Sequence, residues 1–115
     1  MDCPTFIKMQ QTFDQVLRIA KTTAAKFGLK EDDITEADII LDPNYNAKIY
    51  GIPDETTIAA MKFGARTEAF ITDPVYVGKS LAGMIDLIKP GKISGGNGLY
   101  ADLGGQQALN AYSSI

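Results

Sequence analysis

Apolar residues recur at three- and four-residue spacing in several parts of this 115-residue chain, and each such part predicts a helix. The first runs from about Thr12 to Phe27, with apolar positions at Phe13, Val16, Leu17, Ala20, Ala24 and Phe27. Thr12 and Gln15 fit a capping box at its start, and Gly28 fits the left-handed position that ends many helices. Residues 1–11 show no clear period and contain a proline, so we expect an irregular lead-in there.

Two more periodic segments follow. Asp54 is a suitable N-cap for a helix that continues to about Ala65 and presents Ile58, Met61 and Ala65. The next helix is expected to begin near Gly78 or Lys79 and to end at Lys89-Pro90-Gly91, with apolar positions at Leu81, Met84, Ile85 and Ile88. These patterns predict amphipathic helices that each bury one face.

Short apolar runs between the helices predict strands at Ala37–Leu41, Ala69–Thr72 and Gly98–Ala101. Asp42-Pro43 and Asp73-Pro74 close the first two, because proline has no N–H to donate. After Leu103-Gly104-Gly105, a last helix is expected to carry Ala108, Leu109 and Tyr112. The alternation of helix and strand predicts an α/β fold with a three-layer parallel sheet. Three short strands are few for such a sheet, which favours a piece of a larger domain over a minimal domain.

Composition removes several classes of function. An apolar share of 45% and a net charge of −3 describe an ordinary soluble domain, and no basic stripe indicates nucleic acid or a membrane surface. The single Cys3 forbids an internal disulfide. The absence of histidine argues against a zinc site or a serine–histidine–aspartate triad built from this chain alone. No apolar run is long enough to span a bilayer and no signal-peptide pattern opens the chain, which favours a cytoplasmic protein.

Two chemical hypotheses follow from the residues. Gly78–Ser80 and Gly104-Gly105 precede helices and could hold a small anion or cofactor, although simple turn chemistry explains paired glycines more often. Alternatively, Tyr50 and Tyr76 lie in loops just before helices and could act as acid–base groups at a common mouth. The competing explanation for each is a half-buried tyrosine bonded to a backbone carbonyl.

Lys48 and Lys79 are the candidates for a Schiff base. A lysine in that role has to be desolvated or placed beside another charge, and neither lies in an apolar run. We therefore expect both to be solvated.

Several strings closely resemble the C-terminal part of the 1-aminocyclopropane-1-carboxylate deaminase and D-cysteine desulfhydrase family. They are Gln15-Val-Leu-Arg-Ile-Ala-Lys, Tyr50-Gly-Ile-Pro-Asp, Ala65-Arg-Thr-Glu, Thr72-Asp-Pro-Val-Tyr, Gly78-Lys-Ser, Gly83-Met-Ile-Asp and Leu103-Gly-Gly-x-x-Ala-Leu-Asn-Ala-Tyr. The resemblance implies that residues 12–115 are the C-terminal portion of a pyridoxal 5′-phosphate enzyme domain with a tryptophan-synthase-β-like fold. It also implies that a small amino-acid substrate is opened to 2-oxobutanoate and ammonia.

By the same resemblance, Tyr50 and Tyr76 match the tyrosines that face the substrate, with Tyr76 as base or nucleophile. Val77, Leu103 and Gly104 match positions at the cofactor. Leu103 is typical of the deaminases, but Val77 stands where they typically have a glutamate, so it cannot accept the pyridinium proton. Asp102 and Gln106-Gln107 also depart from the family pattern.

The family's Schiff-base lysine and phosphate loop lie upstream of anything present here, so we expect little or no activity from the isolated chain. The first alternative is a non-catalytic remnant or interaction module, favoured slightly by Val77, that docks on a full-length relative through an exposed sheet edge. A D-cysteine desulfhydrase is a third possibility, weakened by Leu103. The family commonly forms homodimers, so a homodimer or pairing with a relative is expected.

Overall fold

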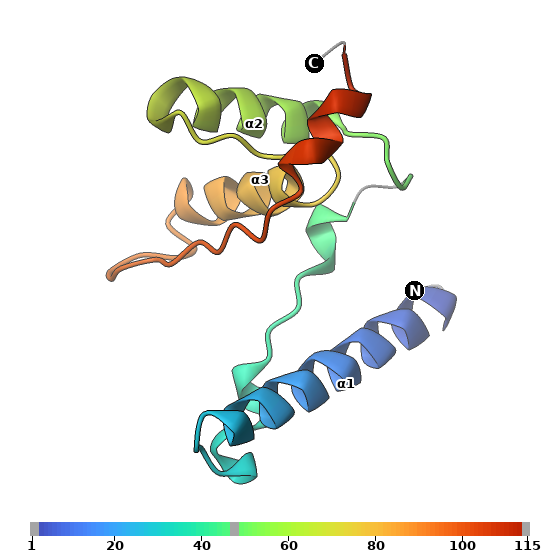
Figure 1. Ribbon diagram of the computed structural model, residues 1–115, viewed down its shortest axis with the longest axis vertical. Helices are drawn as coiled ribbons and strands as arrows, with labels where there is room; N and C mark the ends of the chain where they lie inside the picture. Colours follow the sequence, from blue (N-terminus) through green and yellow to red (C-terminus); the bar gives the residue numbers. More distant parts are fainter. Residues whose placement is uncertain (1–2, 47–48, 114–115) are drawn as a thin grey trace. The chain divides into compact units, whose positions relative to one another are not determined.

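The computed structural model describes residues 3–46 and 49–113, and its regular elements are all helical (Figure 1). They are α1 (Cys3–Lys26), α2 (Glu55–Glu68), α3 (Val77–Ile88) and four 3₁₀ segments, η1 (Glu31–Asp33), η2 (Glu36–Asp38), η3 (Pro43–Tyr45) and η4 (Gln106–Ala111). The chain divides into two compact units, Met1–Pro43 and Asn44–Ile115, here called the N-terminal and C-terminal units.

The prediction of a three-layer parallel sheet is wrong, because residues 3–46 and 49–113 contain no strand. Strands require backbone hydrogen bonds to a neighbouring strand. Here Ala69 adopts a left-handed φ of 52° and ends α2, while the carbonyl of Ile71 accepts from the Gln106 side chain at 3.1 Å. Residues 36–38 form η2, and residues 98–101 have no regular secondary structure. The sheet edge expected to dock on a relative is likewise missing from this part of the chain.

Helix α1 begins earlier than its apolar period predicts. It starts at Cys3, so residues 3–11 are helical and not an irregular lead-in. Pro4 lies in the first turn, where N–H groups have no intrahelical partner, and the residues that follow are mostly good helix formers. Thr12 is therefore no cap; its hydroxyl donates to the carbonyl of Lys8 at 2.9 Å. A domain boundary at residue 12 stays a prediction.

The end of α1 is as predicted. Gly28 has a φ of 82°, and the N–H of Leu29 closes back on the carbonyl of Ala24 at 3.1 Å. This satisfies carbonyls that the last helical turn leaves free.

Helices α2 and α3 lie side by side and form the core of the C-terminal unit (Figure 1). Ala60, Leu81 and Ala82 are buried between them, with Phe70, Met84, Ile85 and Tyr100 packed against this cluster. Gly64 permits the close approach, because a Cβ there would lie 3.1 Å from Leu81 Cδ2. The predicted period of α3 therefore marks its packed face through Leu81, Met84 and Ile85. In α2 the residue buried at this contact is Ala60, which the predicted face did not include, and the predicted Ala65 is exposed.

Both helix starts agree with the sequence to within one or two residues. Asp54 is the N-cap of α2 and accepts the Thr57 N–H at 2.7 Å, as predicted. Helix α3 begins at Val77, and Gly91 follows its end with a φ of 73°. The expected last helix is the shorter η4, which carries Ala108 and Leu109.

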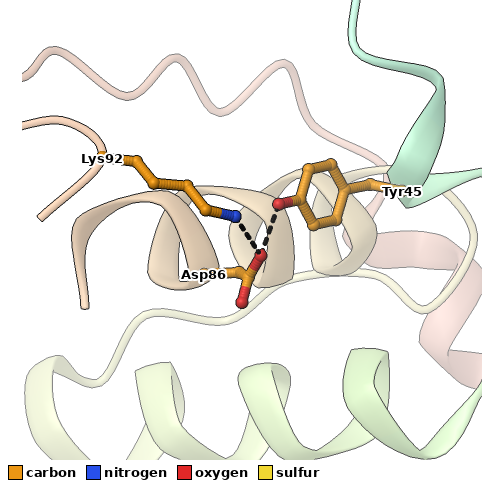
Figure 2. A network of polar contacts seen from close by, with 3 residues as sticks. All are labelled: Tyr45, Asp86 and Lys92. Atoms are coloured by element: carbon orange, nitrogen blue, oxygen red, sulfur yellow. Dashed lines mark hydrogen bonds and ion pairs between the residues drawn. The ribbon is translucent and has the colours of Figure 1, made fainter. Parts of the chain in front are cut away.

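Tyr45 ties the segment before α2 to α3. Figure 2 shows its hydroxyl donating to Asp86 Oδ2, at 2.6 Å, while Lys92 Nζ lies 3.5 Å from the same oxygen. The ring packs over Gly83, where a Cβ would lie 3.0 Å from it. This network anchors the start of the C-terminal unit.

Across the described ranges, no helix combines the length and apolarity that crossing a bilayer requires.

Candidate functional site

Tyr50 and Tyr76 come together in the C-terminal unit, although 26 residues separate them in the chain. Their hydroxyl oxygens are 2.5 Å apart, and their rings meet edge to face with centroids 6.2 Å apart. The side chains are 76% and 61% exposed. The competing explanation of half-buried tyrosines bonded to backbone carbonyls is therefore wrong. The two hydroxyls, here called the tyrosine pair, form an exposed hydrogen-bonding group.

Tyr76 holds its proton more firmly than a free tyrosine does. The pKa of Tyr76 is raised, first by the hydrogen bond to Tyr50, then by the charge Tyr50 carries when ionised, and less by burial and the negative charge of Asp73. Each contribution disfavours the phenolate. Near neutral pH Tyr76 is therefore a proton donor, and it needs a nearby cation before it can serve as a base.

Asp73 positions Tyr76 at the start of α3. Its side chain is 0% exposed, and its Oδ1 accepts the N–H groups of Val75 and Tyr76 at 2.8 and 2.7 Å. Its Oδ2 accepts the N–H of Val77 at 2.8 Å, and its carbonyl accepts the N–H of Gly78 at 2.8 Å. A buried carboxylate is tolerated when hydrogen bonds satisfy it, and a helix N-terminus favours negative charge. Asp73 thus satisfies the free N–H groups in the turn that leads into α3.

From the sequence, Asp73 was expected only to end a strand. The signal for its actual role was available: an aspartate shortly before an apolar period of 3.6 residues is an N-terminal capping signature. The capping also weakens the anion hypothesis for Gly78–Ser80. The N–H groups of Val75 to Gly78 are already donated to Asp73.

The loop that carries Tyr50 is fixed from two sides. Gly51, with a φ of 77°, accepts the Tyr112 hydroxyl at its carbonyl, and Asp54 caps α2 just beyond it. The pKa of Asp54 is lowered by hydrogen bonds from the Thr57 side chain and backbone, with a smaller contribution from the charge of Lys79. Lys79 is half-buried, and the effect of its charge on Asp54 places it in the neighbourhood of a carboxylate. Lys48, the other Schiff-base candidate, lies outside the described residues.

The three residues expected at a cofactor have different surroundings. Val77 is buried, with its N–H donated to Asp73 and its carbonyl accepting the hydroxyls of Tyr100 and Ser80 at 2.8 and 3.0 Å. Leu103 is 90% exposed, and Gly104 has a φ of 97° with its N–H donated to Asp102 at 2.9 Å.

The loop after Leu103 packs against the turn that precedes Tyr76. A Cβ on Gly105 would lie 2.7 Å from Asp73 Oδ2, so this glycine packs directly on the carboxylate. Tyr100, which was expected in a strand, has a role that the sequence did not predict. Burial is the main cause that raises the Tyr100 pKa, and its hydroxyl joins loop 98–102 to α3.

The arrangement can hold and donate protons, but it has no cluster for a metal. No group of three or more His, Cys, Asp or Glu side chains within the described ranges is placed to bind a metal ion. The chemistry available at the tyrosine pair is therefore hydrogen bonding and proton transfer.

Comparison with known proteins gives a consistent result. No family model matches the chain. It is 60% identical over 108 residues to a probable 1-aminocyclopropane-1-carboxylate deaminase of Cryptococcus neoformans, which covers 93% of this chain. It is 51% and 50% identical over 109 residues to 1-aminocyclopropane-1-carboxylate deaminases of Variovorax paradoxus and Ralstonia pickettii, with 94% of this chain covered. The chain spans only 31–32% of the length of these relatives.

Proposed function

We infer that this chain, which belongs to the 1-aminocyclopropane-1-carboxylate deaminase family, contributes the tyrosine pair to the active site of such an enzyme. The proposed reaction opens the ring of 1-aminocyclopropane-1-carboxylate and consumes one water to give 2-oxobutanoate and ammonia. The observation that carries this proposal is the 2.5 Å contact between the exposed hydroxyls of Tyr50 and Tyr76. The identity to named deaminases supplies the reaction class.

The pair has two phenolic protons, and the hydrogen bond between the oxygens uses one of them. The other can be donated to the substrate, either to its carboxylate or to the ring carbon that gains a proton on opening. The tyrosine that gives up its proton is then stabilised by a charge-assisted hydrogen bond from its partner. The raised pKa of Tyr76 keeps its hydroxyl protonated near neutral pH, and it also makes Tyr76 a weaker acid than a free tyrosine.

The family resemblance implies pyridoxal 5′-phosphate, which supplies an electron sink for the substrate. The described residues do not complete a site for it. Val77 is apolar, and its N–H and its carbonyl already form hydrogen bonds with Asp73 and Tyr100. The N–H of Gly104 is donated to Asp102. We propose that the cofactor's lysine and phosphate ligands come from the two thirds of the enzyme that this chain does not match.

The test reconstitutes a divided enzyme. The purified chain is assayed for 2-oxobutanoate with substrate and cofactor, alone and mixed with the unmatched segment of the Variovorax paradoxus relative. We expect no product from the chain alone and product from the mixture. In the mixture, Tyr76→Phe should lower the rate by about 100-fold or more, the usual contribution of a positioned proton donor. The matched control is Tyr45→Phe, since that hydroxyl bonds Asp86.

Each of the other possible outcomes would support a different function or role. Product from the chain alone would show that it is catalytically complete. A stable complex without product would favour an interaction module. Sulfide release from D-cysteine by the mixture, without ring opening, would favour a desulfhydrase. An unaltered rate in Tyr76→Phe would remove the tyrosine pair from the proposed reaction.

A further inference from the structure

We propose that Asp73 is the positioning residue of the tyrosine pair: its buried carboxylate fixes the turn that sets Tyr76 against Tyr50 and seats the Gly105 loop on that turn. This inference rests on the proposed function of the pair. Asp73 itself contacts neither hydroxyl. Its proposed role is to hold the residue that does.

The first step is the geometry around Tyr76. Asp73 accepts the N–H of Tyr76 and those of both neighbours, Val75 and Val77, at 2.7–2.8 Å. Three consecutive peptide groups are therefore held by one carboxylate, and the direction in which the Tyr76 side chain leaves the backbone is set by them. Hydrogen bonds to an ionised acceptor are the stronger kind, so this turn is fixed more firmly than by a neutral cap.

The second step is the contact with Gly105. This residue has a φ of 95°, and a Cβ there would lie 2.7 Å from Asp73 Oδ2 and 2.9 Å from its Cγ. No real side chain fits at that distance without movement of the carboxylate. Next to it, Gln106 donates its side-chain amide to the carbonyl of Ile71 at 3.1 Å. The loop after Leu103 is thus seated on Asp73 and covers it from water.

The third step separates Asp73 from an ordinary helix cap. Asp54 caps α2 through one residue, Thr57, whose N–H it accepts at 2.7 Å, and its side chain is exposed. Asp73 is fully buried, makes three such bonds and adds its charge to the surroundings of Tyr76. Loss of Asp54 should therefore weaken a helix, while loss of Asp73 should also displace the tyrosine pair.

The experiment uses the 115-residue chain with tyrosine labelled at Cζ. Two readouts report on the pair: the nuclear Overhauser effect between the Tyr50 and Tyr76 rings at neutral pH, and the alkaline titration of Tyr76, assigned with Tyr76→Phe. In Asp73→Ala we expect loss of the ring–ring effect and a downward shift of the Tyr76 pKa. Both the lost Tyr50 contact and the lost charge lower that pKa, so their effects add.

Three further variants define the role. Asp73→Asn should give an intermediate result, because its amide oxygen can still accept from Val75 and Tyr76 while its NH₂ faces the Val77 N–H. Gly105→Ala should weaken the ring–ring effect with the carboxylate still present. Asp33→Asn is the matched control, since it removes the charge of an exposed capping carboxylate in the N-terminal unit, which accepts the Lys30 N–H at 2.8 Å; it should leave both readouts unchanged.

A folded Asp73→Ala chain with an intact ring–ring effect and an unshifted titration would overturn the proposal. If circular dichroism shows that this variant is unfolded, Asp73→Asn and Gly105→Ala decide in the same way, and unchanged readouts in both overturn it. None of these measurements uses enzyme activity. A failed reconstitution of the deaminase would therefore not change the outcome of this test of Asp73.

Discussion

The two units of the chain differ in the reach of their contacts. Among residues 8–43, Ala24 is the one buried apolar residue. The side-chain hydrogen bonds within residues 8–38 join residues three or four apart, such as Gln10 with Asp14. In the C-terminal unit, hydrogen bonds join Tyr45 with Asp86 and Tyr112 with Gly51, 41 and 61 residues apart.

This difference shows where a site can be built. Local hydrogen bonds support a helix or a turn, but they cannot bring two distant side chains to a fixed separation. The C-terminal unit has a core around Leu81 and long-range bonds across it, and it is there that the tyrosine pair is held at 2.5 Å. The following changes test whether the two units respond as differently as their contacts indicate.

The largest expected effect is on the core. Leu81 is 4% exposed, and Leu81→Ala should lower the free energy of unfolding of the C-terminal unit by about 2–4 kcal/mol through lost burial and a cavity. Val16 in α1 is 36% exposed, and Val16→Ala should change stability by no more than about 0.5 kcal/mol. All five tyrosines lie in the C-terminal unit, so tyrosine fluorescence during urea denaturation follows that unit. Equal losses of unfolding free energy in Leu81→Ala and Val16→Ala would contradict the expected difference between the two units.

A pair of glycines gives the next largest effect. A Cβ on Gly78 would lie 2.6 Å from the Asp73 carbonyl oxygen and 2.8 Å from Met61 Cγ. Gly78→Ala should therefore cost about 1–3 kcal/mol by overpacking, even though alanine favours helices. Gly28 faces open space, and Gly28→Ala should cost about 1 kcal/mol through its positive φ.

The two substitutions should also be detected in different places. Gly28→Ala should speed hydrogen exchange at the end of α1 and leave the tyrosine signal unchanged. Gly78→Ala should shift the tyrosine-detected transition in urea. The comparison fails if Gly28→Ala shifts that transition as far as Gly78→Ala does.

The sequence was sufficient for features that depend on neighbouring residues. The period of α3, the Asp54 cap and the Gly28 stop need only local chemistry, and all three are confirmed. Strand pairing is not local: an apolar run such as 69–72 has the same pattern whether or not another strand lies beside it. The sheet was therefore predicted where no partner strand exists in the described chain.

In the candidate site, too, features that depend on neighbouring residues were easier to predict than contacts between distant ones. Tyr50 and Tyr76 were expected at a common mouth because each precedes a helix, and their hydroxyls do meet. Their catalytic roles stay predictions. Asp73 was misassigned because an Asp-Pro pair can end a strand or cap a helix, although the apolar helical period that follows it favours the cap. Nothing local to Gly105 indicates that its missing side chain makes room for that carboxylate.

The smallest expected effect is on the pH dependence of the Tyr45–Asp86–Lys92 network. The pKa of Asp86 is lowered, first by the Tyr45 hydroxyl and then by the charge of Lys92. A carboxylate with a lowered pKa in the folded state stabilises that state at pH values above its ordinary pKa of 3.8, and this contribution disappears as the pH falls through the lowered value. Tyr45→Phe should therefore raise the Asp86 pKa and make the C-terminal unit less sensitive to acid.

Carboxyl-carbon titration by nuclear magnetic resonance measures this directly, with Asp38 as the internal reference. The Asp38 pKa is lowered by the backbone N–H and the hydroxyl of Thr35, only three residues away. Tyr45→Phe should move Asp86 and leave Asp38 in place, and Lys92→Ala should move Asp86 less because its ion pair is more than half exposed. A shift of both carboxylates by Tyr45→Phe would contradict the prediction that the Tyr45 hydroxyl acts on Asp86 alone.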